Sequence, residues 1–245
     1  GTSGTPVPST STAILDFVNT GNLDSGLRVA GGVLVTYGAA KTVWTTVTST
    51  CNSAQAVINV AAATGWAGSD EIVASATERN SGQYELRTIS SIATLAVTVS
   101  SNWSNKHSGS SSASVPNTVR GHVGNLTHNV RIRGTSNSLR AFLHVATNGS
   151  ATLRYTQIKW VGSAFTSFKN GISWAISCTL DIQYCSVWAY GTITTGGAGF
   201  GAFTLSNNFF HASDSQGVTI SDTTTVTAWT TSAARPASDS TAPPG

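Results

Sequence analysis

The stretch RGHVGNLTHNVRIRGTSNSLRAFLHVATNGSATLRYTQIKW, residues 120–160, decides the predicted fold. It opens with a turn rich in Gly and Asn, alternates through residues 129–133, breaks at Gly134, and restarts at residues 141–145 and 151–160. Alternation of apolar and polar residues between Gly, Asn and Ser turns predicts half-buried strands. No helix is needed to account for this pattern.

The end of this stretch recurs downstream. LRYTQIKW at 153–160 aligns with IQYCSVWA at 182–189 and with LSNNFFHA at 205–212, while Val130 stands upstream in the place of Leu153; the offsets are 23, 29 and 23 residues. A repeat of this length with short strands predicts a solenoid in which each coil buries its apolar side chains against the next. The predicted fold is all-β, a right-handed single-stranded parallel β-helix. A β-sandwich with evenly spaced strands is the alternative.

The composition suits a surface of stacked β-coils. Charged residues make up 9% of the 245 residues, against about 25% in an average domain, so Ser, Thr, Asn and Gly must keep the chain in solution. The net charge is +3, and the basic residues concentrate around Arg131 and Arg133, which alternation places on one face of a strand. That face is a candidate anion-binding strip. No aromatic residues interleave with it, so no nucleic-acid partner is expected.

The cysteines and the absence of targeting motifs in this sequence say little about function. Cys51, Cys178 and Cys185 are odd in number and lack metal-ligand spacing, so buried thiols are expected, with a bridge between Cys178 and Cys185 as the alternative. The sequence shows no signal peptide, no 18-residue apolar run and no lipidation motif, which predicts no membrane insertion. Methionine is absent, which suggests a processed product or a segment of a longer protein.

The order of turns and strands divides the chain into four parts. We expect a flexible N-terminal arm at 1–12, a strand-rich β region at 13–134, parallel β-helix coils at 135–230, and a Pro-containing tail or linker at 231–245.

Several phrases of the second part resemble the G8 domain, a module of large extracellular proteins. They are KTVWT at 41–45, TGW at 64–66, DEIV at 70–73, and above all VGNLTHNVRIRG at 123–134, in which His128 replaces the more usual basic residue. The resemblance covers about residues 33–134. It implies a G8-like β region followed by a parallel β-helix in an extracellular, glycan-facing setting, and it implies no catalytic set.

The coils are also similar to β-helical virion proteins of tailed bacteriophages. This resemblance rests on their composition, which is rich in Ser, Thr and Ala, and on segments such as RGTSNSLRAFLHVAT at 133–147. It implies a structural virion surface protein, a spike, fibre or decoration, located on the virion surface or outside the cell. The implied partners are copies of the chain itself, expected as a trimer, other virion proteins, and host surface glycans.

Candidate catalytic residues are scarce. Asp181, Asp214 and Asp222 are the acidic residues of the coils, and no two hold matching positions, whereas glycoside cleavage needs paired carboxylates. The five histidines form no metal-binding cluster, and no G-x-S-x-G elbow occurs. We therefore predict no enzyme, no metal and no cofactor. The alternatives are a secreted polysaccharide lyase or hydrolase, or a cell-surface adhesion module.

Aromatic residues are the best candidates for ligand contacts. Tyr155 and Tyr184 align in the repeat and share the parity of the apolar core positions, as does Trp160, so these rings are expected to stack in the core. Trp188 falls one residue off this parity and is expected to face outward. The predicted ligand-binding residues are Trp188, Tyr190, Arg131 and Arg133.

Overall fold

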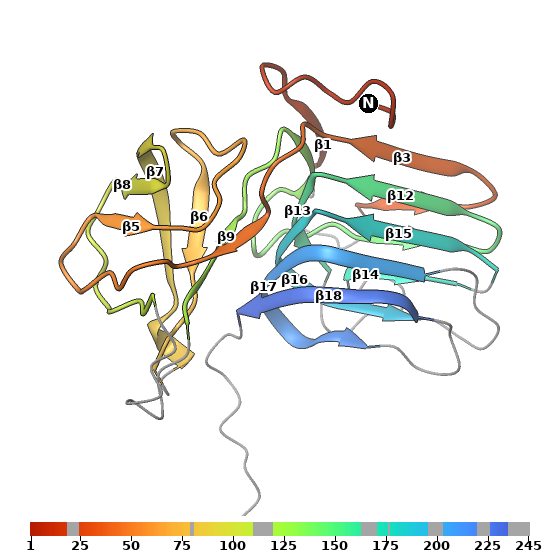
Figure 1. Ribbon diagram of the computed structural model, residues 1–245. Helices are drawn as coiled ribbons and strands as arrows, with labels where there is room; N and C mark the ends of the chain where they lie inside the picture. Colours follow the sequence, from red (N-terminus) through yellow and green to blue (C-terminus); the bar gives the residue numbers. More distant parts are fainter. Residues whose placement is uncertain are drawn as a thin grey trace, which may run out of the picture.

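The computed structural model describes residues 1–18, 25–78, 81–109, 120–162, 171–175, 177–195, 203–219 and 226–234. The expected tail lies outside these residues from position 235 onward. Within them the chain is β-structure with a single 3-10 turn, Ser81–Gln83, and contains no helix that could cross a membrane. Figure 1 shows two parts side by side, a stack of parallel strands and a smaller unit of antiparallel strands.

The stack winds through three faces, and every strand pairing within it is parallel. The first face contains β1 (Ala13–Phe17), β10 (Val130–Gly134), β13 (Thr156–Val161), the start of β16 (Ser186–Thr195), the middle of β17 (Phe203–Thr219) and the end of β18 (Val226–Ala234). The second contains β2 (Leu27–Val29), β11 (Leu143–Val145), β14 (Gly171–Trp174) and the ends of β16 and β17. The third contains β3 (Val33–Tyr37), β12 (Ser150–Arg154), β15 (Thr179–Gln183) and the starts of β17 and β18.

This pairing confirms the all-β, parallel, coiled architecture and excludes the β-sandwich for the stack, because a sandwich is built from antiparallel layers. Two of the three repeat alignments are also confirmed, since Leu153 pairs with Ile182 and Ile182 with Leu205. The third is wrong. Val130 pairs with Ala13 and Thr156 on the first face, whereas Leu153 lies on the third.

The smaller unit is inserted between β3 and β10. It contains β4 (Trp44–Thr46), β5 (Val57–Asn59), β6 (Glu71–Ala74), β7 (Glu85–Ala93), β8 (Ala96–Val99) and β9 (His122–Asn125), paired antiparallel in the order β4-β9-β6-β7-β8-β5. Because β1, β2 and β3 pair with β10, β11 and β12, they form the first coil of the stack. The expected division at residue 134 therefore does not follow the strand pairing.

Three apolar clusters hold the molecule together. One fills the inside of the coils and one fills the inserted unit. The third, which we call the interface cluster, joins the two: it contains Val43, Val73 and Leu126 of the insert with Trp188 and Phe209 on the outside of the coils. The insert thus buries the outer surface of the first face, and this fixes its position relative to the stack.

The corner after the third face repeats an unusual backbone conformation. Tyr155, Tyr184 and Asn207 occupy it in three successive coils with φ of 48°, 55° and 54°. A left-handed residue interrupts strand alternation, so the side chain leaves the parity of the strand before it. The two tyrosines accordingly lie half-buried outside the coil core. The expectation of core stacking is wrong for them, and for Trp160, which has φ of 57° and also lies outside.

Candidate functional site

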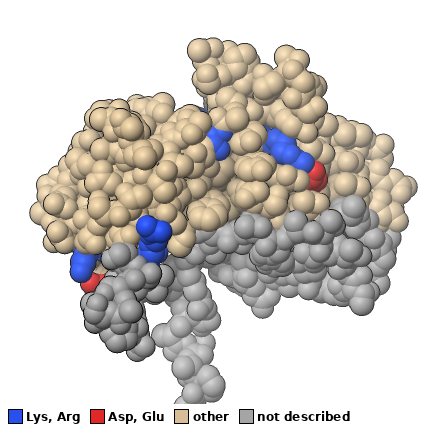
Figure 2. Space-filling view, in the orientation of Figure 1, with Lys and Arg blue, Asp and Glu red and all other residues tan. Residues whose placement is uncertain are grey.

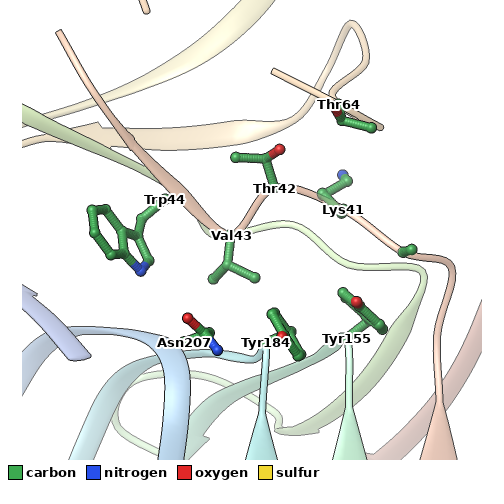
Figure 3. Close-up of a pocket in the computed structure, with 9 residues that line it drawn as sticks. Lys41, Thr42, Val43, Trp44, Thr64, Tyr155, Tyr184 and Asn207 are labelled. Atoms are coloured by element: carbon green, nitrogen blue, oxygen red, sulfur yellow. The ribbon is translucent and has the colours of Figure 1, made fainter. Parts of the chain in front are cut away.

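The corner residues line a groove between the insert and the coils, which we call the tyrosine groove (Figure 3). It has a volume of about 390 Å³, within the usual range for small-ligand sites. One wall is the chain segment that leads from the first coil into the insert, and the other is the corner. The lining residues are Ala40, Lys41, Thr42, Val43, Trp44, Thr64, Tyr155, Tyr184 and Asn207.

The tyrosine groove combines ring surface with neutral polar groups. The rings of Tyr155 and Tyr184 are stacked with centroids 5.1 Å apart and planes 18° apart. In Figure 3 the two rings and the Asn207 amide lie in a row facing Val43. Burial and the neighbouring Tyr184 raise the pKa of Tyr155, so its hydroxyl stays protonated at neutral pH. No carboxylate is among the lining residues, and the charge of Lys41 is balanced by Asp70 at 2.8 Å. The groove therefore favours a neutral, hydroxyl-rich ligand portion that has an apolar face.

A second groove, which we call the arm groove, lies between the N-terminal arm and the insert and has a volume of about 400 Å³. Asn129 ties the arm down, because its Nδ2 lies 2.9–3.1 Å from the carbonyl oxygens of Val7, Pro8 and Ser11. Its Oδ1 accepts a hydrogen bond from the Ala39 N–H at 2.9 Å. The lining residues are Ser9, Thr12, Ala39, Ala40, Lys41, Gly65, Trp66, Ala67, Asp70, Thr127, His128, Asn129 and Arg131.

Asp70 is the single carboxylate among the residues that line the arm groove, and one of its oxygens accepts three hydrogen bonds. Its Oδ2 accepts hydrogen bonds from Lys41 Nζ at 2.8 Å, from Asn125 Nδ2 at 2.8 Å and from the Ala67 N–H at 3.0 Å. Lys41 Nζ donates in addition to the carbonyl of Thr127. The Lys41–Asp70 pair is therefore neutral as a unit and holds the groove in shape.

The four residues expected to bind ligand fall in different places. Trp188 does lie outside the coil core, but the insert and the Lys159 ammonium, 3.6 Å from its ring centroid, cover it to 8% exposure. Tyr190 lies inside the coil core with 3% exposure, which leaves no ring surface for a ligand. Arg133 pairs with Asp16 at 2.9 Å, whereas Arg131 lines the arm groove.

Sequence reasoning missed the tyrosine groove although it placed Tyr155 and Tyr184 in register. The available signal was the third member of the same column, Asn207. Asn tolerates a left-handed backbone better than other non-glycine residues, so its presence in an otherwise aromatic column indicated a turn and an outward side chain.

Among the other groups considered for chemistry, those that the structure describes lie in structural contacts. The Asp181 carboxylate pairs with Arg154 and accepts a hydrogen bond from Gln183 Nε2 at 2.9 Å. The side chain of Asp214 and the whole of Asp222 lie outside the described residues. In the described part of the chain no three His, Cys, Asp or Glu side chains are arranged to hold a metal ion. The three cysteines are buried free thiols.

His211 gives the contact between coils and insert a pH dependence. It is 4% exposed, and its ring meets the Tyr84 ring edge-on at 5.0 Å. Burial lowers the pKa of His211 from 6.5 to about 4, so the unfolded chain binds the extra proton first as the pH falls. The free energy of unfolding should therefore decrease between pH 6.5 and pH 4, by about 1.4 kcal/mol per pH unit from this group.

Replacing His211 with Phe is expected to remove this contribution. Urea unfolding of both proteins at pH 7, 5.5 and 4 should show a shallower loss of stability for the variant. Equal slopes would contradict the assignment.

Fold and grooves together define a class: a stack of parallel β-coils that carries an inserted antiparallel domain, with two open grooves where the parts meet. No family model matches the sequence, and a search of curated proteins finds no match. The G8 resemblance therefore stays a prediction.

The solved structures to which this chain is similar include three bacteriophage tailspikes. The first is the Gp54 tailspike of Acinetobacter baumannii bacteriophage AP22 in complex with A. baumannii capsular saccharide (13% identity, TM-score 0.32, 84% of this chain and 40% of that chain). The others are tailspike gp49 from Pseudomonas phage LKA1 (14%, 0.30, 82% and 42%) and the Pseudomonas phage phi297 tailspike gp61 (12%, 0.30, 85% and 32%). The chain spans less than half the length of each. The fold described above rests on the strand pairing of this chain itself.

Proposed function

We propose that this chain is a glycan-binding module of a bacteriophage surface protein, and that the tyrosine groove holds the glycan. The observation that carries the proposal is the outward corner column of Tyr155, Tyr184 and Asn207. Sugar rings offer apolar C–H faces and many hydroxyls, and this groove offers aromatic rings next to phenol and amide groups. Because the column is built by repetition of one corner, it extends along the stack in the direction a polymer would run.

The charge distribution supports an uncharged glycan portion at the tyrosine groove. Figure 2 shows that charged side chains are sparse on the described part of the visible face. The groove residues also favour binding over cleavage, because glycoside hydrolysis uses two carboxylates flanking the bond. Across both grooves the lining residues include only the carboxylate of Asp70, which is occupied by Lys41.

Three further expectations from the sequence are part of this proposal. They are a right-handed winding of the coils, assembly into a trimer on the virion surface, and contact with other virion proteins. A native mass three times that of the chain would support the trimer, and a monomeric mass would remove it.

The proposal is tested by binding of bacterial surface polysaccharides to the wild type and to groove variants, screened on a glycan array and quantified by calorimetry. Tyr184→Ala is expected to weaken binding at least about tenfold, because it removes one of two anchoring rings. Tyr184→Phe keeps the ring and should retain most of the affinity. Asn207→Gly removes the amide while accepting the left-handed backbone, so it should lose affinity without losing stability.

Tyr37→Ala is the matched control, since Tyr37 is a half-buried tyrosine of the same stack that lines neither groove. Equal losses for Tyr37→Ala and Tyr184→Ala would contradict the proposed site. Release of new reducing ends from a bound polymer, abolished by Asp181→Ala, would replace binding by cleavage as the function.

A further inference from the structure

The arm groove has a cation that its own residues do not neutralise. The charges of Lys41 and Asp70 cancel, as described above. Arg131 therefore gives the residues that line the groove a net positive charge. Arg131 Nε donates to the carbonyl of His128 at 2.9 Å. Within the described residues, its two terminal nitrogens have no hydrogen-bond acceptor. The half-buried guanidinium is therefore held through Nε, and its terminal nitrogens are available to a ligand.

The wall of the groove supplies no counter-charge. His128 is 1% exposed, and neither of its ring nitrogens has a hydrogen-bond partner among the described residues. Burial, together with the charges of Lys41 and Arg131, lowers the pKa of His128 to about 3, so the imidazole is neutral at pH 7. An anion that pairs with Arg131 in the groove therefore has to be supplied by a ligand.

The two grooves border the same segment, since Ala40 and Lys41 line both. A ligand longer than one sugar ring that fills the tyrosine groove and crosses this segment enters the arm groove. There it meets the hydroxyls of Ser9 and Thr12 on the arm, and Arg131 on β10. The chemistry changes along that path from neutral and aromatic to cationic and hydroxyl-lined.

We propose that the arm groove is a second subsite for the same polymer and that Arg131 binds the carboxylate of an acidic sugar there. This inference rests on the proposed glycan-binding function. It specifies the ligand as an acidic polysaccharide, in which a neutral residue faces Tyr155 and Tyr184 while a carboxylate-bearing residue lies against Arg131. The guanidinium is suited to this role because its planar donors match the two oxygens of a carboxylate.

The experiment measures binding of bacterial polysaccharides that contain both neutral and carboxylated residues, such as hyaluronan, each also in a form whose carboxylates have been reduced to alcohols. For a polymer that binds, the reduced form and the Arg131→Gln variant should each lose about tenfold in affinity. The variant should bind the reduced form as the wild type does, because the lost interaction is then already absent. Arg131→Lys keeps the charge but not the fork of donors and should recover part of the affinity.

Arg133→Gln is the matched control, because Arg133 lies two residues further on the same face of β10, is paired with Asp16 and lines neither groove. The reduced polymers test the wild type directly and do not depend on how well a variant folds. Wild-type affinity that is equal for acidic and reduced polymers, with Tyr184→Ala still weakening both, would overturn this inference and leave the proposed function standing. Binding to none of the polymers on the array or in solution would overturn both.

Discussion

Replacing Trp174 with alanine is expected to lower the free energy of unfolding by about 3–5 kcal/mol, the usual cost of removing a large aromatic side chain from a core. Trp174 lies on β14 with 1% exposure, and its ring is stacked on Phe203 of the third face with centroids 4.4 Å apart. The contact joins two faces across the inside of the coils, so a cavity at this point loosens the stack from within. Urea unfolding followed by far-UV circular dichroism measures the change.

Trp174→Phe is the control that separates packing from polarity. The indole Nε1 is buried without a hydrogen-bond partner among the described residues, so phenylalanine loses some volume but also removes an unsatisfied donor. Its cost should be well below that of alanine. A phenylalanine variant as unstable as the alanine variant would contradict the stacked arrangement.

The second large effect is expected at the contact between insert and coils. A β-carbon on Gly124 would lie 2.4 Å from Cε1 of the Phe209 ring, and this ring is buried in the interface cluster. Gly124→Val should therefore cost about 3 kcal/mol, the upper end of the overpacking range. The loss should appear as separation of the insert from the stack, seen as earlier proteolysis within residues 44–125 and greater exposure of Trp188.

Two comparisons make this prediction specific. Gly68→Ala places a β-carbon in the same insert 3.5 Å from its nearest neighbour, an ordinary contact, and should be close to neutral. In a Phe209→Ala background the further cost of Gly124→Val should shrink, because the clashing ring is gone. An unchanged cost in that background would locate the effect elsewhere.

The coil register could be predicted from the sequence where one coil follows another directly. Leu153, Ile182 and Leu205 carry the same inward position in consecutive coils, and nothing interrupts the repeat between them. The first coil could not be recognised in the same way, because the insert separates β3 from β10. Sequence periodicity detects repeats that follow one another along the chain, whereas Ala13 and Val130 are neighbours only in space.

The grooves were harder to predict for two physical reasons. Alternation assigns faces on the assumption that φ stays negative, and the left-handed residues Tyr155, Tyr184 and Trp160 break that assumption at the corners. Exposure also depends on what covers a face. Trp188 faces outward as expected, yet the insert buries it. The sequence of the coils contains no local pattern that predicts this contact.

The position of the insert has a consequence for how such a chain changes over time. It leaves and rejoins the stack at adjacent points, since Ala39 N and Asn129 Oδ1 are 2.9 Å apart although 90 residues separate them in sequence. In a later coil the single residue Tyr155 links the same two faces between β12 and β13, whereas about 90 residues do so here. Closure entropy grows by only about 0.6 kcal/mol for each doubling of loop length, so a long insertion is tolerated at this corner. We therefore expect that another domain can replace the insert at this junction while the parallel hydrogen bonds between the coils are kept.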